Sequence, residues 1–200
     1  MTKNIVKNQG DCPYDRIVAA ARHLFAIRGF HQTAMADLAA EANVSVGAIY
    51  RSFPSKAEII RAIIVSDTAR HLTDLQQVVD QVSSGSLSVA QGLEKVILSE
   101  LAYTEQALSH EVLAEGHRNR DVAETIGRFC VQYRSLFRDL AAFANPGLSK
   151  ADLDGGAELL LASMFGFSHA KLSSPCMSDE ETARAARRLI LRSLGVDSGD

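Results

Sequence analysis

The sequence predicts an all-helical fold, and three observations carry that prediction. Only four of the 200 residues are proline, so few positions would interrupt a helix. Alanine and leucine are plentiful while runs of β-branched residues are few, a balance that favours helices over strands. Apolar residues recur three and four positions apart along much of the chain, as on one face of a helix.

The chain begins with two predicted helices. Apolar residues at i, i+4, i+7 and i+8 from Ile17 predict an amphipathic helix over 14–28. Gly29 follows it, as the position after a helix prefers. Thr33 is a suitable N-cap for a short second helix over 34–42.

A tight turn and two further helices follow. Asn43 is a residue type that tolerates a left-handed backbone, so it can form the turn. Ser45 can cap a third helix over 46–53, which a proline then ends. Ser55 can cap a long fourth helix over 56–82.

Five more helices are expected, which gives about nine in all. The polar breaks "SSGS", "ANPGLS" and "SSPCMS" separate them, and Asn119 or Asp121 can cap the seventh. The expected ranges are 88–105, 107–117, 121–143, 150–172 and 179–194.

Two short helices joined by a tight turn, with another helix in front, predict a helix-turn-helix unit. Ala39 would lie where the two helices cross, and Val44 and Ile49 would fill the unit's core. In such units the second helix enters the major groove of DNA.

The charge distribution agrees with that expectation. Residues 1–61 contain eight Lys or Arg and five Asp or Glu, a net charge of about +3. Residues 62–200 contain thirteen against nineteen, a net charge of about −6. A basic head on an acidic body suggests a polyanionic partner for the head. We therefore expect a DNA-binding domain over 1–61 and a second helical domain over 62–200.

Gly47 lies in the first turn of the short third helix. Glycine there costs about 1 kcal/mol relative to alanine. A side chain at this position would hold the helix away from the DNA backbone, whereas glycine allows close approach.

The stretch "TAMADLAAEANVSVGAIYRSFPSKAEII" resembles the DNA-binding signature of the TetR family of bacterial transcriptional repressors, and "FAIRGF" resembles the end of that family's first helix. The resemblance covers residues 14–62. Asn43 and Val46 depart from the usual glycine and polar residue. The matching positions are Thr33, Leu38, Ala39, Ala42, Val44, Ser45, Gly47, Ile49, Tyr50, Phe53, Ser55 and Lys56.

The resemblance implies DNA-contacting roles for part of this segment. Tyr50 and Lys56 resemble phosphate-contacting residues, and Arg51 could donate two hydrogen bonds to a guanine edge. Each has a simpler interpretation as a helix cap, a core aromatic or a solvated surface charge. The predicted DNA-binding set is Thr33, Met35, Ser45, Val46, Gly47, Ala48, Tyr50, Arg51 and Lys56.

The resemblance also implies a ligand pocket in the second domain. A mix of aromatic and a few polar side chains would suit a small, mostly apolar molecule. The candidate lining residues, each of which could instead be ordinary core or surface, are Leu101, Tyr103, Leu113, His117, Phe129, Tyr133, Phe137, Phe165 and His169.

Two apolar stripes, over 153–168 and 182–194, are wide enough to need a partner surface. We expect them to form a homodimer interface, as the resemblance also implies. A two-fold dimer would read a palindromic operator. The expected function is a ligand-responsive transcriptional regulator of the repressor type, released from its operator by the effector.

Other function classes find less support. A helical enzyme or carrier without DNA binding is the alternative, but no nucleophile–base set, phosphate-binding loop or GxGxxG is visible. A helix-turn-helix that contacts only protein is a third possibility. His110 and His117 would lie about 10.5 Å apart along a helix, too far for one metal ion. We therefore expect no metal and no cofactor.

Composition also bears on location. Three widely spaced cysteines outside any CxxC pattern suggest reduced thiols in the cytoplasm. The start "MTKNIVKNQGDCPYD" lacks the apolar stretch of a signal peptide, and no apolar run is long enough to span a membrane. We expect a cytoplasmic protein without a membrane partner.

Overall fold

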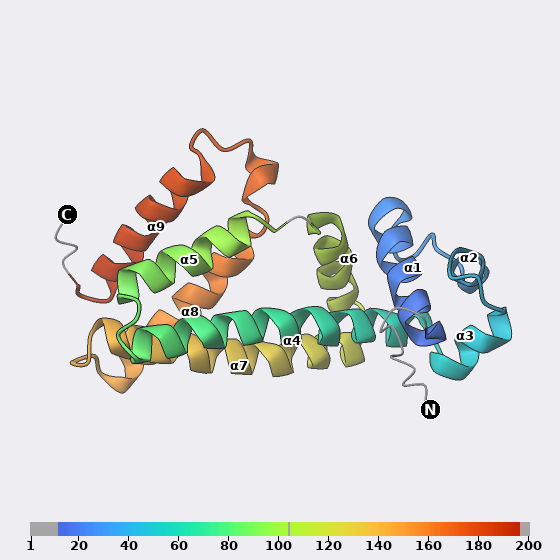
Figure 1. Cartoon of the computed structure of the whole chain (residues 1–200), viewed down its shortest axis with the longest axis horizontal. Coiled ribbons are helices and arrows are strands. Elements are labelled where there is room, and N and C mark those ends of the chain that lie inside the picture. Colours follow the sequence, from blue (N-terminus) through green and yellow to red (C-terminus); the bar gives the residue numbers. More distant parts are fainter. Residues whose placement is uncertain (1–11, 104, 197–200) are drawn as a thin grey trace, which may run out of the picture. The chain divides into compact units, whose positions relative to one another are not determined.

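The all-helical prediction is confirmed. The computed structural model describes residues 12–103 and 105–196, and every regular element in that part of the chain is a helix (Figure 1). The expectation of no signal peptide rests mainly on residues 1–11, which lie outside the described residues. The elements are α1 (Pro13–Arg28), α2 (Met35–Glu41), α3 (Val46–Ser52), α4 (Lys56–Ser83), α5 (Val89–Leu101), α6 (Gln106–Gly116), α7 (Arg120–Ala144), α8 (Lys150–Phe167), the 3₁₀ helix η1 (Ala170–Ser173) and α9 (Asp179–Ser193).

Two of the expected helices end earlier than the sequence suggested. The helix expected over 88–105 ends at Leu101, because the chain then turns and the Tyr103 backbone N–H donates to the Glu100 carbonyl at 3.2 Å. The helix expected to reach residue 172 ends at Phe167 and is followed by η1. Both differences lie at element ends, where apolar spacing gives little guidance.

The structure comprises two compact units, which divide the chain differently from the expected domains. Unit 1 contains the described residues of 1–67 and 107–126, and unit 2 contains those of 68–106 and 127–200. Unit 1 thus extends past the expected boundary at residue 61 and adds α6 and the first turns of α7. A boundary read from a linear sequence could not anticipate this later segment.

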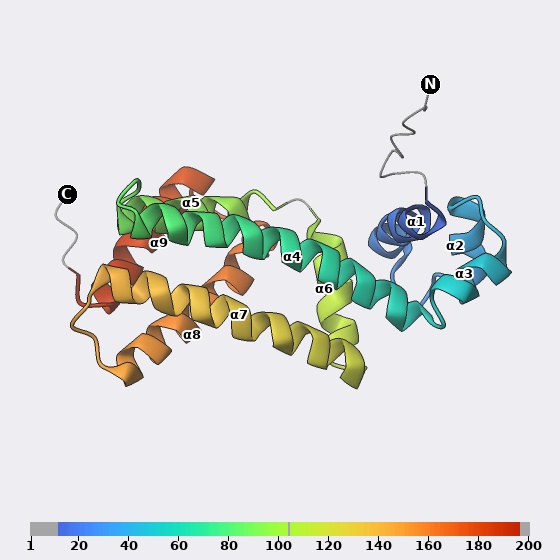
Figure 2. The same cartoon turned by 60° about the horizontal axis from the view of Figure 1, so that its bottom comes forward.

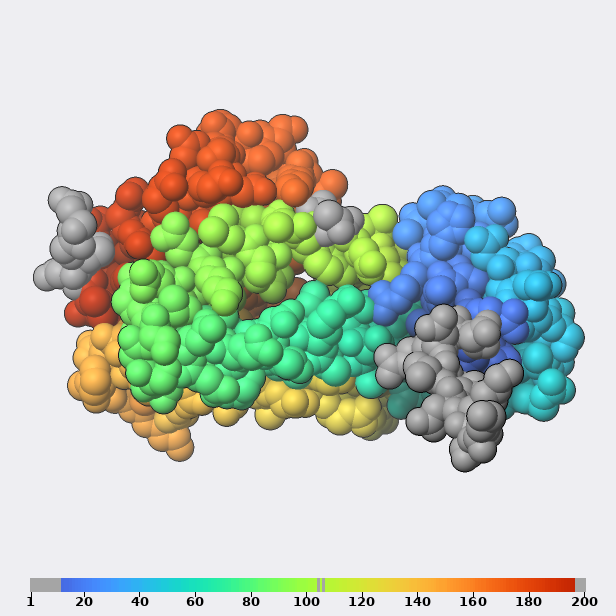
Figure 3. All heavy atoms as spheres, in the orientation of Figure 1, coloured from blue at the N-terminus to red at the C-terminus, as the bar shows by residue number. Residues whose placement is uncertain are grey.

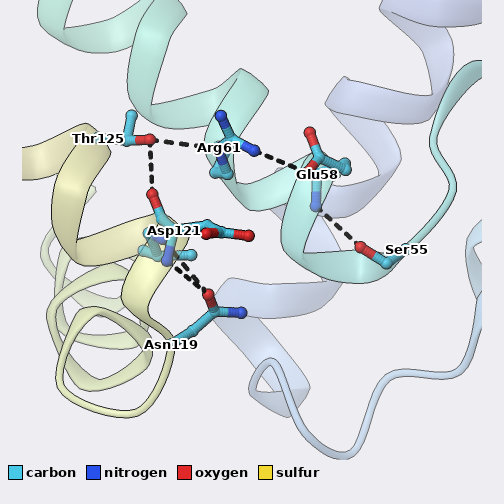
Figure 4. Close-up of polar contacts among 7 residues, drawn as sticks. Ser55, Glu58, Arg61, Asn119, Asp121 and Thr125 are labelled. Atoms are coloured by element: carbon cyan, nitrogen blue, oxygen red, sulfur yellow. Dashed lines mark hydrogen bonds and ion pairs between the residues drawn. The ribbon is translucent and has the colours of Figure 1, made fainter.

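Polar contacts explain why the start of α7 belongs to unit 1 (Figure 4). Arg61 of α4 donates from Nε to Thr125 Oγ1 at 3.2 Å and from Nη1 to Glu58 Oε1 at 2.7 Å. The Thr125 hydroxyl, which is buried, donates to the Asp121 carbonyl at 2.8 Å. Asn119 caps α7 by accepting from the Asp121 backbone N–H at 3.0 Å, as the sequence predicted.

In unit 1, α1, α2 and α3 pack against one another around a small apolar core. Phe25 and Phe30 meet edge to face with ring centroids 5.2 Å apart. The buried apolar side chains of this core include Ile17, Leu24, Phe25, Phe30, Leu38, Ala39, Ile49 and Phe53.

In unit 2, α5 packs against α8 and α9, and the parts of α4 and α7 in this unit run side by side (Figures 1 and 2). A Cβ added at Gly92 of α5 would lie 2.7 Å from Val82 Cγ2 of α4, so glycine permits this close helix contact. The larger buried side chains of the core include Leu75, Val79, Leu93, Ile97, Phe137, Leu140, Leu160, Met164, Ile190 and Leu194.

The apolar stripes over 153–168 and 182–194 were expected to form a homodimer interface, but most of their apolar side chains are covered within unit 2. Leu160 is 1% exposed and Ile190 is 5% exposed, because α5 covers both helices. The exposed large apolar side chains of α8 and α9 are instead Leu159, Phe165 and Leu189. The sequence could not predict that residues such as Leu160 and Ile190 are buried within the chain. A wide apolar stripe has the same pattern whether it packs against its own core or against another chain.

None of the described helices combines the length and the apolar character needed to cross a bilayer.

Candidate functional site

Helix α3 has one buried face and one exposed face. Ile49 is fully buried and Phe53, the residue after α3, is 3% exposed, so both hold the helix to the core of unit 1. Val46 and Tyr50 lie one turn apart on the other side, at 41% and 52% exposure. Arg51 is exposed beside them. The core-aromatic interpretation of Tyr50 therefore fails.

The turn that precedes α3 has the predicted conformation. Asn43 has a positive φ of 50°, the left-handed region that asparagine tolerates. The Val44 backbone N–H donates to the Ala39 carbonyl at 3.0 Å and so closes the turn. Ser45 caps α3, since its Oγ accepts from the Ala48 backbone N–H at 3.2 Å. The turn and cap fix the angle at which α3 leaves α2.

Gly47 has no packing reason to be glycine. It is exposed, and a Cβ built there would meet only Arg51 Nη1, at 3.9 Å. Nothing within the described chain would oppose a side chain at this position. Packing within the described part of the chain therefore does not explain the glycine.

Thr33 differs from its predicted role as a helix cap. The N-cap of α2 is Ala34, whose backbone N–H donates to Asp37 Oδ2 at 2.9 Å. Thr33 is 1% exposed, and its hydroxyl donates to the Gly29 carbonyl at 2.9 Å. The Thr33 side chain thus closes the connection between α1 and α2 and is not on the surface.

The Lys56 side chain is also hydrogen-bonded within the protein. Its ammonium donates to the carbonyls of Phe30, His31 and Thr33 at 2.7, 3.3 and 2.8 Å, and it lies 4.7 Å from the centroid of the Phe30 ring. Burial lowers the pKa of Lys56 from its ordinary value, and the nearby Glu115 carboxylate opposes that shift. In this conformation Lys56 fastens the connection between α1 and α2 to the start of α4.

The remaining members of the predicted DNA-binding set, Met35 and Ala48, are half-buried. The structure therefore brings Ser45, Val46, Gly47, Tyr50 and Arg51 together on the exposed side of α3 and its cap. We call these five residues the α3 surface.

Residues 17–63 match the family model described as bacterial regulatory proteins of the tetR family. The match assigns this N-terminal segment to the tetR family of bacterial regulatory proteins. A family of regulatory proteins also agrees with the expectation that the chain is not an enzyme.

Curated HTH-type transcriptional regulators match part of the chain. The HTH-type transcriptional regulator UidR of Escherichia coli K12 is 35% identical over 109 residues, which are 54% of this chain and 54% of UidR. The HTH-type transcriptional regulator TtgR of Pseudomonas putida is 39% identical over 69 residues, which are 34% of this chain and 33% of TtgR. The chain thus matches about half or less of the length of these relatives.

A solved structure matches more of the chain. Salmonella enterica GusR superposes with a TM-score of 0.71 at 27% identity, covering 90% of this chain and 95% of GusR. The shared architecture therefore extends beyond the helix-turn-helix.

The predicted ligand-binding residues are distributed between the two units of the structure. Leu113 and His117 belong to unit 1, and the other seven belong to unit 2. His117 and Phe165 are exposed, whereas Leu101 and Phe137 are buried in or near the apolar core. The half-buried members are Tyr103, Leu113, Phe129, Tyr133 and His169.

Three of the predicted ligand residues do come together in unit 2. The rings of Tyr133 and Phe137 stack with centroids 6.1 Å apart. Tyr103 lies within electrostatic range of Tyr133, and its ring meets His71 of α4 edge to face at 5.5 Å. Burial first, and then the acidic neighbours, raise the pKa of Tyr133 above its ordinary value.

Sequence reasoning missed Glu100 of α5, a second polar group at this place. Burial raises the pKa of Glu100 to about 7. A signal for it was present, since Glu100 follows Val96 by four positions and Ile97 by three, and both are buried. A carboxyl group on the apolar face of a helix is rare enough to single out.

Across the described residues, no group of three or more His, Cys, Asp or Glu side chains is arranged to hold a metal ion. The absence of a cofactor stays a prediction.

Proposed function

We propose that this chain is a transcriptional regulator that binds double-stranded DNA through the α3 surface. The observation that carries the proposal is the exposed side of α3. There Gly47, which has no side chain, leaves the helix backbone accessible between Val46 and Tyr50. A short helix with such a face suits the major groove, where its first residues reach phosphates and base edges. The similarity to UidR, an HTH-type transcriptional regulator, supports the same proposal.

Lys56 takes a different part in this proposal from the one expected. Its three backbone acceptors make it a positioning residue that holds the connection between α1 and α2 beside the helix-turn-helix. Direct phosphate contact by Lys56 would require those hydrogen bonds to break. We therefore assign phosphate contact to Ser45 and Tyr50, and base contact to Arg51.

The regulator would act as a homodimer on a palindromic operator. Leu159, Phe165 and Leu189 provide exposed apolar surface on α8 and α9. Gly155, Ala162 and Gly166 are exposed at helical spacing from Leu159, and small residues allow a second helix to approach closely. This outer surface replaces the buried stripe residues as the proposed dimer contact.

A small molecule would control DNA binding. In the proposed repressor, a cytoplasmic effector binds near Tyr133 and Phe137, which already stack. It weakens DNA binding if it has higher affinity for a conformer whose two α3 surfaces no longer match the spacing of the half-sites.

Selection from a random duplex library tests the DNA-binding proposal. We expect the full chain to enrich an inverted repeat, and we expect affinity for it to fall steeply as salt rises, because phosphate contacts release counterions. A variant with Lys150→Ala at the start of α8, outside unit 1, is a control that should enrich the same sequence. No enrichment, together with binding that salt does not weaken, would contradict the proposal.

A further inference from the structure

Two acidic side chains of α6 face the connection between α1 and α2, residues 29–34, inside unit 1. Glu111 Oε2 accepts the Phe30 backbone N–H at 2.7 Å. Glu115 follows one turn later, and its side chain is 8% exposed. Figure 3 shows the yellow-green atoms of α6 beside the blue atoms of α1. Helix α6 therefore supports the connection that leads into α2.

The Glu115 carboxylate lacks a hydrogen bond that its burial calls for. Its Oε2 atom is buried and has no hydrogen-bond partner within the part of the chain that the structure describes. The Nε2 atom of His31, in the connection, lies 3.6 Å from Glu115 Oε2, just beyond hydrogen-bond distance. Because buried polar atoms are normally paired, this oxygen indicates a partner that binds it in another state of the protein.

A third side chain explains why His31 does not supply that hydrogen bond. Arg118, in the turn between α6 and α7, places its Nη1 atom 3.1 Å from His31 Nε2. A guanidinium can only donate, so His31 Nε2 must accept, and the imidazole is then neutral with its hydrogen on Nδ1. In this state His31 Nε2 has no hydrogen to donate to Glu115.

Protonation of the imidazole reverses these roles. Both ring nitrogens then carry a hydrogen, so His31 Nε2 can no longer accept from Arg118, and the two positive charges repel each other. The Nε2–H can instead donate to Glu115 Oε2 after a shift of roughly half an ångström. Histidine is the side chain whose charge ordinarily changes between about pH 5 and pH 8, so mild acid can exchange the partner of His31.

Four charged groups surround the imidazole. Lys56, from α4, lies within electrostatic range of Glu115, and its ammonium is held by three backbone carbonyls. Lys56 and Arg118 oppose a positive charge on His31, whereas Glu111 and Glu115 favour it. Among these four groups, only Glu115 has a buried oxygen without a hydrogen bond, so Glu115 gains most from the new donor.

We propose that His31 is a proton-dependent switch between the α1–α2 connection and α6. Neutral His31 accepts from Arg118 and leaves Glu115 Oε2 unpaired. Protonated His31 releases Arg118 and donates to Glu115, so that α6 holds the connection through one more charged hydrogen bond. The proton thus controls how firmly α6 holds the segment that leads into the helix-turn-helix.

Hydrogen exchange of the Phe30 amide, followed by NMR in the full chain, tests the switch. This N–H donates to Glu111, so it exchanges when the connection opens away from α6. Its protection, relative to a free peptide at the same pH, should rise about fivefold from pH 8 to pH 6, the effect of about one ion pair with an exposed partner.

Four variants separate the switch from other effects of pH. His31→Ala removes the imidazole and Glu115→Gln removes the charge that pairs with it, so both should abolish the rise. Arg118→Ala removes only the competing donor and should keep the rise. His117→Ala is the matched control, since it removes an exposed imidazole beside the same turn and should also keep the rise.

Equal protection at the two pH values in the parent chain would overturn the proposal. A rise that survives in His31→Ala or in Glu115→Gln would overturn it as well. The parent chain and the variant of the exposed His31 keep the proposal testable if Glu115→Gln does not fold. The readout does not involve DNA, so a chain that shows the rise but binds no duplex keeps the switch and loses only the proposed function.

Discussion

At the scale of single residues, the side chains around α3 are of two kinds: some are exposed to a partner, and others are hydrogen-bonded within unit 1. Tyr50 and Arg51 are exposed and available to a partner, whereas the Thr33 hydroxyl and the Lys56 ammonium are held by backbone carbonyls within unit 1. A motif identifies which residues matter but does not say whether a residue touches the partner or positions one that does.

Arg51→Ala should relax sequence preference at one position of each half-site. If Arg51 donates two hydrogen bonds to a guanine, its loss costs about 1–3 kcal/mol per half-site. Binding to unrelated duplexes should fall much less, since that affinity comes from phosphates. Anisotropy titrations with the selected duplex and with a scrambled one measure both effects. Equal losses on the two duplexes would mean that Arg51 contacts phosphate and that base reading lies with Met35 or Ala48.

Glu100 should make stability depend on pH. Its folded-state pKa of about 7 lies above the ordinary value of 4.5, so the folded state binds more protons than the unfolded state between these values. Stability contributed by this group therefore falls as pH rises from about 4.5 to about 7 and is level above that.

Glu100→Gln removes that dependence. As the pH rises through this window, the free energy of unfolding of the variant should therefore come to exceed that of the parent chain by about 1–3 kcal/mol. Urea unfolding at a series of pH values measures the difference, and Asp139→Asn, which removes an exposed carboxylate of α7, is the control with an unchanged profile. Parallel stability curves for Glu100→Gln and the parent chain would show that Glu100 titrates normally.

At the scale of elements, the exposure of an apolar residue of α8 or α9 decides whether it can contribute to a dimer contact. Leu160 and Ile190 belong to the core of unit 2, so a charge at either position would unfold the unit and report nothing about assembly. Leu159 and Leu189, at 43% and 65% exposure, can be changed without opening that core.

Leu159→Glu combined with Leu189→Glu should convert a dimer into a folded monomer. The added carboxylates would be buried against each other in the proposed contact, where like charges repel. Light scattering gives the mass and circular dichroism gives the helix content. Val131→Glu changes an exposed apolar residue of α7, at 64% exposure, and should leave the dimer intact. A double variant that remains dimeric places the interface elsewhere.

The sequence was most informative where structure is local. The Asn43 turn, the Ser45 cap and the Asn119 cap depend on contacts between residues two to five apart, and each is present. Helix ends were less predictable, because the chain leaves α5 and α8 where apolar spacing continues.

Contacts between residues far apart in the chain could not be predicted from the sequence. No local pattern indicates that Lys56 donates to the Phe30 carbonyl 26 positions earlier, or that residues 107–126 join unit 1. The same holds for the approach of Glu100 to Tyr133, which only the fold brings together.

At the scale of the whole molecule, the proposal joins two functions that belong to different units. The α3 surface lies in unit 1, and the stacked rings of Tyr133 and Phe137 lie in unit 2. Helices α4 and α7 each contain residues of both units. An effector in unit 2 can change DNA binding only as far as its affinities for two conformers of the chain differ.

The central claim is that the α3 surface lies against DNA, and Gly47 gives its most direct test. Gly47→Leu should leave folding intact and raise stability by up to about 1 kcal/mol, because the structure has open space there and a helix loses a glycine. Anisotropy titrations should show that the variant loses affinity for selected and scrambled duplexes alike, since the leucine would obstruct the DNA backbone. A folded Gly47→Leu protein that binds DNA as tightly as the parent chain would contradict the account.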